Sequence, residues 1–179
     1  VTGVQTCALP ILEMDLWFKT QNEPVLCTHC RGTGWAAGGF LRDKTSKEVI
    51  RMIQLQWPQF GMPKLIRFDA GTEFNSDEFL DFLRQNDIFP EGAASGSHWS
   101  IGAGERINAL IKENFKALSE SYPDQDKHVI LQEAFNAHNW LPTHKGLPPA
   151  VRVLGSLPRV PTVLDTRSET ALDERVSDE

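Results

Sequence analysis

Short apolar runs of two kinds alternate along the chain, and their spacing predicts a mixed α/β domain. Four runs have strand character, and they cover residues 11–19, 23–32, 34–43 and 63–69. The stretch "RGTG" between the second and third runs is typical of a turn, so we expect the first three strands to form an antiparallel meander. The fourth run follows a helical segment, which favours parallel pairing with an earlier strand.

Four other segments carry apolar residues at helical spacing: residues 43–61, 75–86, 104–122 and 126–141. Thr45 is followed three residues later by Glu48, and Asn75 by Glu78, which is the pattern of a capping box. We therefore expect Thr45 and Asn75 to cap the first two helices. Pro58 is expected to end the first of them.

The segment between the second and third helices, residues 92–104, is rich in glycine and serine and is expected to be a mobile loop. The full order is then three strands, a helix, a strand, a helix, this loop and two helices. Such an order predicts a mixed sheet flanked by helices, which is the α/β class. A chain of 179 residues is long enough for one domain of this kind.

The two ends of the chain differ from the rest. Residues 1–11, "VTGVQTCALPI", resemble a translated sequencing adapter and lack the basic and apolar regions of a signal peptide. We expect them to be non-native, to pack against nothing specific and to follow an upstream truncation of the reading frame. Residues 165–179 hold six acids and two arginines and are expected to be a disordered tail. The domain itself is expected over residues 12–164.

Charge and cysteine content narrow the class of protein only slightly. The net charge is −6, of which the tail contributes −4, so the other 164 residues carry −2 and do not indicate nucleic-acid binding by themselves. Three cysteines do not make a disulfide framework, which favours a reducing intracellular compartment. No apolar run approaches the roughly 20 residues that span a bilayer, so no membrane partner is expected.

Three acidic residues stand out by position. Asp15 lies within the first strand, Asp69 ends the fourth, and Glu105 starts the third helix. If the first and fourth strands are neighbours, the two aspartates can converge, and a helix across the sheet could add Glu105. Such a group needs a divalent cation to offset its repulsion, and oxygen-only ligands favour Mg²⁺ or Mn²⁺. The alternatives are a turn cap at Asp69 and a favourable helix N-terminus at Glu105.

Several motifs in order carry a family resemblance. The stretches "MDLW", "FDAGTEFNSDEF", "SHWSIGAGERINALIK" and "AFNAHNWLPTHKGLPPAVRVLG" together resemble the integrase catalytic core of long-terminal-repeat retrotransposons and retroviruses, over about residues 12–164. The resemblance implies an RNase H-like fold with a mixed five-stranded sheet. It also implies that Asp15, Asp69 and Glu105 are the catalytic residues and ligate two Mg²⁺ or Mn²⁺ ions.

The same resemblance implies partners and a reaction. Lys112, Asn108 and Arg106 would contact DNA from the helix that carries Glu105. The implied reaction is 3′-end processing followed by strand transfer into target DNA, by a homo-oligomer of the full-length protein in the host nucleus. The sequence departs from the family at Ala70, at Ile101 and in "VLCTHCRGTG". A plain nuclease of this fold and a decayed or domesticated interaction module therefore stay open.

Two other motifs lead to plainer interpretations. Cys27 and Cys30 in "CTHC" suggest zinc, but residues three apart in a strand point to opposite faces, so no zinc is expected in this fragment. The family's zinc-binding domain would lie upstream. Ser97 and His98 lack a nucleophile elbow around them, so no hydrolase triad is expected.

Overall fold

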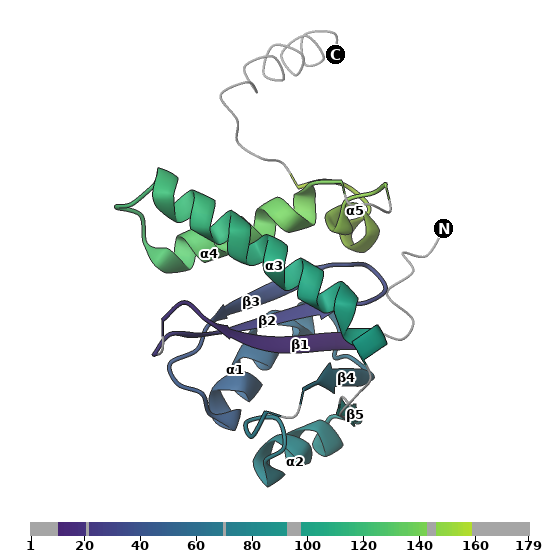
Figure 1. The fold of residues 1–179 in the computed structure, drawn as a ribbon. Helices are drawn as coiled ribbons and strands as arrows, with labels where there is room; N and C mark the ends of the chain where they lie inside the picture. The colour runs from purple at the N-terminus through teal and green to yellow at the C-terminus, as the bar shows by residue number, and fades with distance from the viewer. Residues whose placement is uncertain (1–10, 21, 70, 93–97, 143–145, 159–179) are drawn as a thin grey trace, which may run out of the picture.

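The computed structural model describes residues 11–20, 22–69, 71–92, 98–142 and 146–158, and for residues 98–103 it describes the backbone alone. A five-stranded sheet with the order β3-β2-β1-β4-β5 forms the middle layer (Figure 1). The strands are β1 (Ile11–Phe18), β2 (Pro24–Cys30), β3 (Ala36–Phe40), β4 (Leu65–Phe68) and β5 (Phe89–Gly92).

The strand pairing follows the predicted pattern. β1 pairs with β2 and β2 with β3 in antiparallel fashion, which confirms the meander. β4 runs parallel to β1, and β5 runs parallel to β4. The sequence pattern does not locate β5, because only four residues pair and Pro90 within them cannot donate to a ladder, as is common on an edge strand.

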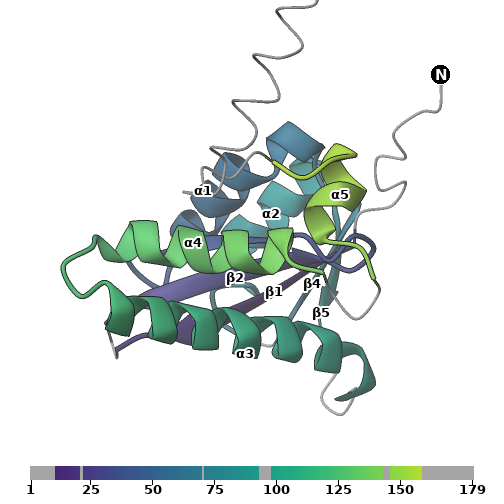
Figure 2. The same cartoon turned by 90° about the horizontal axis from the view of Figure 1, so that it is seen from above.

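The helices cover both faces of the sheet (Figures 1 and 2). The longer ones are α1 (Ser46–Gln56), α2 (Asp77–Gln85), α3 (His98–Ser121) and α4 (Lys127–Trp140). Two short helices are also present, η1 (Pro58–Phe60) after α1 and α5 (Pro149–Leu154) after α4. α1 and α2 lie on one face and α3 and α4 on the other, where they run side by side. Over the described residues, no helix has both the length and the apolar character that crossing a membrane requires.

Each face of the sheet has its own buried apolar cluster. The cluster beneath α1 and α2 includes Leu12, Ile66 and Phe79, all fully buried. The cluster beneath α3 and α4 includes Trp17 and Phe135. Strand residues alternate between the two clusters because successive side chains of a strand point to opposite faces.

The N-caps were predicted correctly for one helix and not for the other. Thr45 caps α1, and its hydroxyl accepts a hydrogen bond from the Glu48 backbone N–H at 3.4 Å. The N-cap of α2 is Ser76 rather than Asn75, and Ser76 Oγ accepts from the Phe79 N–H at 3.1 Å. Asn75 is engaged elsewhere, because its side-chain amide donates to the Gly71 carbonyl at 3.0 Å and closes the preceding turn.

The expected loop over residues 92–104 is wrong in its second half. α3 begins at His98, six residues before the predicted start at Gly104. Glycine costs a helix about 1 kcal/mol relative to alanine, but at Gly104 it permits a close approach to the sheet, described below. The rest of the loop, residues 93–97, lies outside the described residues, and so does Ser97. The short helix α5 was not anticipated.

The structure tests the predicted N-terminal boundary of the domain at Ile11 only. Ile11 is the first residue of β1 and pairs with Leu65, so the adapter-like segment does not stay unpacked over its whole length. The remainder of that segment, residues 1–10, lies outside the described residues, as do residues 159–179 and therefore the predicted tail. Hydrogen-bonded strand pairing depends on the backbone, so an Ile of any origin can complete β1.

Candidate active site

Asp15 and Asp69 lie side by side because of the parallel register of β1 and β4. The paired positions are Ile11 with Leu65, Leu12 with Ile66, and Glu13 with Arg67. Asp15 and Asp69 each follow this last pair by two residues, so they point to the same face and continue the same row. The negative charge of Asp69 acts on Asp15 strongly enough to shift its pKa. The structure therefore brings the two predicted aspartates together.

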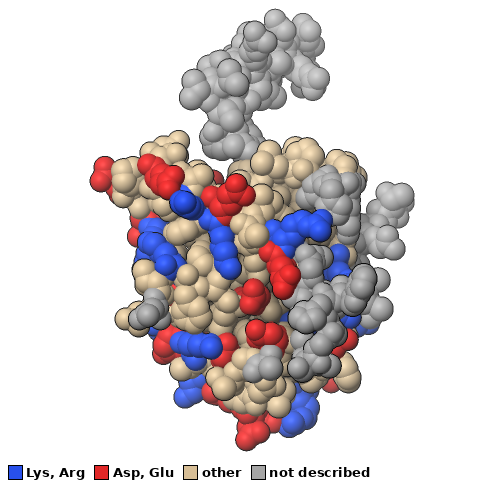
Figure 3. Space-filling view, in the orientation of Figure 1, with Lys and Arg blue, Asp and Glu red and all other residues tan. Residues whose placement is uncertain are grey.

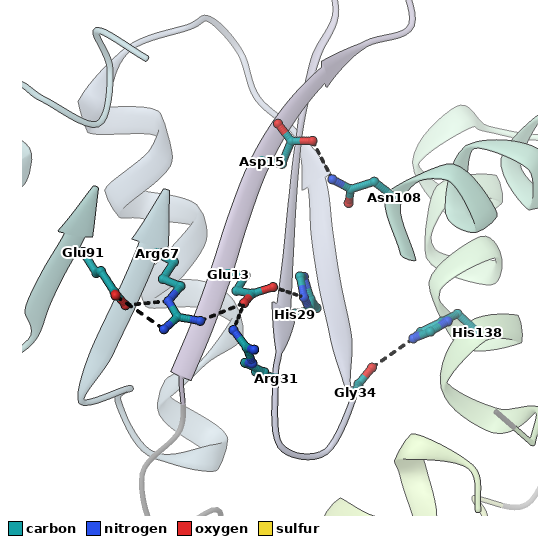
Figure 4. Close-up of polar contacts among 9 residues, drawn as sticks. All are labelled: Glu13, Asp15, His29, Arg31, Gly34, Arg67, Glu91, Asn108 and His138. Atoms are coloured by element: carbon teal, nitrogen blue, oxygen red, sulfur yellow. Dashed lines mark hydrogen bonds and ion pairs between the residues drawn. The ribbon is translucent and has the colours of Figure 1, made fainter. Parts of the chain in front are cut away.

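Asp15 is a half-buried carboxylate that accepts a side-chain hydrogen bond from α3. Asn108 Nδ2 donates to Asp15 Oδ2 at 2.6 Å (Figure 4). Burial raises the pKa of Asp15, and the charge of Asp69 raises it further, while the Asn108 hydrogen bond and the Lys112 charge oppose the shift without cancelling it. The ionised form of Asp15 is thus disfavoured in the folded protein, and a cation beside it would relieve that cost.

Asp69 is exposed and stabilises the turn that follows β4. Its Oδ1 accepts a hydrogen bond from the Gly71 backbone N–H at 3.2 Å, which is the geometry of an Asx turn. The turn cap that the sequence left open is therefore present. It does not exclude a second role, because a carboxylate that accepts one hydrogen bond keeps further lone pairs.

The helix α3 supplies the other predicted residues. Asn108 is buried, at 3% exposure, and its Oδ1 has no hydrogen-bond partner among the described residues. Lys112 is exposed, and its Nζ lies 5.6 Å from the centre of the Trp17 ring. Arg106 and Glu105 are also exposed. Asn108 and Lys112 therefore lie at the aspartate pair, whereas Arg106 stands in solvent on the same helix.

Glu105 does not join the aspartates. Within the part of the chain that the structure describes, no group of three or more His, Cys, Asp or Glu side chains is placed to hold a metal ion. Glu105 is nevertheless three residues from Asn108, about 4.5 Å along the helix axis. Carboxylates repel one another, so a free glutamate side chain gains by remaining in solvent.

A second charged cluster, which was not predicted from the sequence, lies beside the aspartates. Glu13 is buried, and His29 Nε2 lies 2.8 Å from its Oε2. Arg31 and Arg67 contact Glu13 Oε1 at 3.2 and 3.4 Å, and Arg67 also pairs with Glu91 (Figure 4). Glu13 precedes Asp15 by two residues, and Arg67 precedes Asp69 by two. This spacing, which places both on the same face of the sheet as the aspartates, was the sequence feature that could have predicted the cluster.

The charge state of Glu13 follows from these contacts. Burial acts to raise the pKa of Glu13, but hydrogen bonding and charge from His29, followed by Arg31 and Arg67, outweigh it and leave the pKa below its ordinary value. The cluster thus keeps a carboxylate ionised in a buried position. Four neighbouring strands contribute to it, namely β2, β1, β4 and β5.

The donors at the aspartate pair fit a hard divalent cation. Asp15, Asp69 and the unpartnered Oδ1 of Asn108 are all oxygen donors, which suits Mg²⁺ or Mn²⁺ better than zinc. Cys27 and Cys30 belong to the clusters on opposite faces of the sheet, as expected from their spacing. Burial, followed by the nearby Asp15 charge, raises the pKa of the Cys27 thiol.

The surface around the site carries both signs of charge. Basic and acidic side chains are interspersed on the face seen in Figure 3, and neither forms a continuous field there. Long-range attraction of a polyanion by this face is therefore weak, and DNA recognition would depend on short-range contacts.

Sequence comparisons point to retroviral polyproteins. No family model matches the chain. It is 28% identical over 137 residues to the Pol polyprotein of Feline endogenous virus ECE1, and 28% identical over 149 residues to the Gag-Pol polyprotein of Baboon endogenous virus (strain M7). These matches cover 76% and 80% of this chain but only 13% and 9% of the relatives, so the chain spans about a tenth of their length.

A third match is to a different protein. A ferrochelatase from Chlamydia caviae is 28% identical over 111 residues, which is 55% of this chain and 34% of that protein. This match covers less of the chain than the two polyproteins do, and the solved structures with this fold described next are integrases.

Solved structures share the fold. A chain of the simian T-cell lymphotropic virus intasome, solved with PP2A regulatory subunit B56 gamma, matches with a TM-score of 0.74 at 23% identity, over 87% of this chain and 59% of that one. The HTLV-2 integrase catalytic core domain in complex with magnesium matches with a TM-score of 0.71 at 21% identity, over 81% and 97%. The chain therefore has the RNase H-like fold of retroviral integrase catalytic cores and is similar in sequence to retroviral Pol polyproteins.

Proposed function

We propose that this chain is the catalytic core of a DNA integrase that acts by two-metal phosphoryl transfer, first in 3′-end processing and then in strand transfer into target DNA. The observation that carries the proposal is the adjacency of Asp15 and Asp69 on neighbouring parallel strands. The likeness to integrase cores, one of them solved with magnesium, supports the choice of reaction and of cation.

The residues of the chain have separate tasks in this proposal. Asp15 and Asp69 hold the cations, and Glu105 completes the ligand set when its side chain turns toward them. When bound, the cations supply Lewis-acid stabilisation of the attacking and leaving oxygens of the phosphodiester. Asn108 fixes the orientation of Asp15 through its 2.6 Å hydrogen bond. Lys112 and Arg106 contact DNA phosphates from α3.

The assembly and the cellular location belong to the same proposal. Related integrase cores have been solved in dimeric and trimeric forms and in an intasome, which supports a homo-oligomer on DNA. Insertion into chromosomal DNA would take place in the host nucleus.

One observation favours a second candidate, a catalytically decayed or domesticated interaction module. Glu105 stays apart from the aspartates, so the described residues contain a carboxylate pair without a third member. A plain nuclease with this fold would use the same groups. Mg²⁺ affinity separates a decayed module from both enzymes, and joining of two DNA molecules separates an integrase from a nuclease.

The test compares the wild type with Asp69→Asn at matched folding. A longer form of the chain, with the flanking sequence of its reading frame, is given a duplex that ends in the terminal sequence of its element. We expect Mg²⁺- or Mn²⁺-dependent strand transfer by the wild type and none by Asp69→Asn. Asp124→Asn, an exposed change in the α3–α4 turn, is the matched control and should keep full activity. Equal strand transfer by the wild type and Asp69→Asn would refute the mechanism.

A further inference from the structure

The helix α3 approaches the sheet most closely at Gly104. A Cβ atom at this position would lie 2.7 Å from His29 Cε1 and 3.4 Å from Glu13 Oε2. Side-chain carbons essentially never come within 3.0 Å of another heavy atom in this way. Only glycine therefore fits at residue 104 with the helix in this position, and the backbone of this turn lies directly on the Glu13–His29 pair.

The Glu13–His29 pair is held rigidly by burial and by its ion pairs. His29 is 3% exposed, and its Nε2 is held 2.8 Å from Glu13 Oε2. Neither atom has another hydrogen-bond partner among the described residues, so each is the near polar neighbour of the other. Arg31 and Arg67 hold the other carboxylate oxygen of Glu13. A ring confined in this way cannot swing aside at low cost to make room for a methyl group.

The contacts of α3 with β1 follow a matched spacing. Three helix residues meet three strand residues in order: Gly104 at Glu13, Asn108 at Asp15, and Lys112 at Trp17. Four helix residues rise about 6 Å, and two strand residues advance about 6.6 Å, so the two elements stay in step over these contacts. Gly104 is the first contact of the three, and Glu105 is the next residue of the chain.

We propose that the Glu13–His29 pair positions Glu105, by fixing how closely the turn of α3 at Gly104 approaches the sheet. The proposal rests on the proposed function, since it assigns Glu105 to the same metal site as Asp15 and Asp69. Asn108 anchors the following turn at Asp15. A shift at Gly104 would therefore tilt the start of the helix about that anchor and move Glu105 further from the aspartates, so that its side chain could no longer turn to them.

The experiment measures Mn²⁺ binding to the whole 179-residue chain by calorimetry, without DNA and without turnover. Gly104→Ala adds one methyl group against His29. We expect it to weaken Mn²⁺ binding about tenfold, the lower end of what changes in groups supporting metal ligands cause. Glu105→Gln should weaken binding by a similar factor. Ala117→Ser adds one atom at an exposed position of the same helix and should leave binding unchanged.

The combination of variants distinguishes positioning from general damage. In a Glu105→Gln background, Gly104→Ala should have no further effect on Mn²⁺ binding, because it acts through Glu105. Replacing His29 with alanine alongside Gly104→Ala should recover much of the lost affinity, because the methyl group enters the space of the ring. If Gly104→Ala does not fold by circular dichroism, His29→Ala takes its place in the same comparison with Glu105→Gln.

Each result tests either the positioning role of the Glu13–His29 pair or the proposed function. Wild-type affinity in Gly104→Ala, or an undiminished loss in the Glu105→Gln background, overturns the positioning role and leaves the proposed function intact. Failure of the His29 change to restore binding also overturns it. A wild-type chain whose Mn²⁺ binding is absent, or does not depend on Asp69, overturns the proposed function together with this inference.

Discussion

Replacing Asp69 with asparagine should make the protein more stable without a divalent cation and less stable with one. Asparagine keeps the shape of the side chain and the oxygen that accepts the Gly71 N–H, so the turn after β4 is preserved. What is lost is the negative charge beside Asp15. The variant therefore isolates the repulsion between the two carboxylates from the structure of the turn.

The size of the effect follows from the strand geometry. Neighbouring strands lie about 4.8 Å apart, which places carboxylates at adjacent positions roughly 5 Å apart. Coulomb's law then gives about 3 kcal/mol of repulsion at an effective dielectric constant of about 20, and about 0.8 kcal/mol in water. Because Asp69 is exposed, solvent screening favours the lower figure, and we expect a gain of about 1 kcal/mol. Mg²⁺ at about 100 times its Kd would stabilise the wild type by about 2.7 kcal/mol, which reverses the order.

The pH dependence has a definite sign. Burial and the charge of Asp69 raise the pKa of Asp15, so the folded state favours the protonated form. The stability that this group contributes is complete below its ordinary pKa and is lost as the pH rises through the raised value. The advantage of Asp69→Asn should therefore grow across that window and disappear at lower pH.

The assay is urea unfolding followed by tryptophan fluorescence, in EDTA and in Mg²⁺, from about pH 4 to pH 8. Asp124→Asn serves as the control, because it removes an exposed charge from the α3–α4 turn. The reasoning fails if Asp69→Asn is less stable than the wild type in EDTA at pH 7. It also fails if Mg²⁺ stabilises both proteins equally.

Three further predictions concern single side chains. Asn139→Leu should lower the free energy of unfolding by about 2–4 kcal/mol in urea titrations. The reason is that the Ala36 N–H and carbonyl, which bond to Asn139 at 2.9 and 2.8 Å, would lose their partners. A loss no larger than that of the exposed Gln132→Leu would contradict this. Gly38→Ala should cost about 3 kcal/mol or prevent folding, because its Cβ would lie 2.1 Å from the Leu26 carbonyl oxygen, and unchanged thermal unfolding would rule out that crowding. Lys112→Ala should lower the slope of log affinity against log salt for DNA by about one contact without weakening Mn²⁺ binding, whereas Lys116→Ala should change neither.

The sequence predicts the elements of this fold better than the contacts between them. Periodicity and turn residues locate β1 to β4 and the helices α1 to α4, because each such segment shows its buried face locally. β5 is missed because the pairing of Phe89–Gly92 with β4 is set by neighbours distant in sequence. The start of α3 is missed because the glycines before Glu105 are typical of a loop, whereas the backbone is helical from His98 and Gly104 packs against the sheet.

In the candidate site, too, some contacts could be predicted from the sequence and others could not. Asp15 and Asp69 could be paired from sequence, because a period of two along parallel strands fixes which side chains share a face. The hydrogen bond from Asn108 to Asp15 joins residues 93 apart in the chain, and nothing in the local pattern indicates it. Glu105 was expected beside the aspartates, but the structure leaves it apart from them, and its role stays a prediction.

The face of the sheet beneath α3 and α4 explains how the fold tolerates these charges. Around Trp17 this face packs against Phe115 and Phe135, and the opposite face is mainly apolar. Burial in these two clusters supplies the stability, so the other end of the same face can hold Glu13, Asp15 and their partners. An apolar residue at Asp15 would enlarge the core and should raise stability while removing a metal ligand. Asp15, whose ionised form is disfavoured by burial, is therefore best explained by what it binds, because the core would be more stable without its charge.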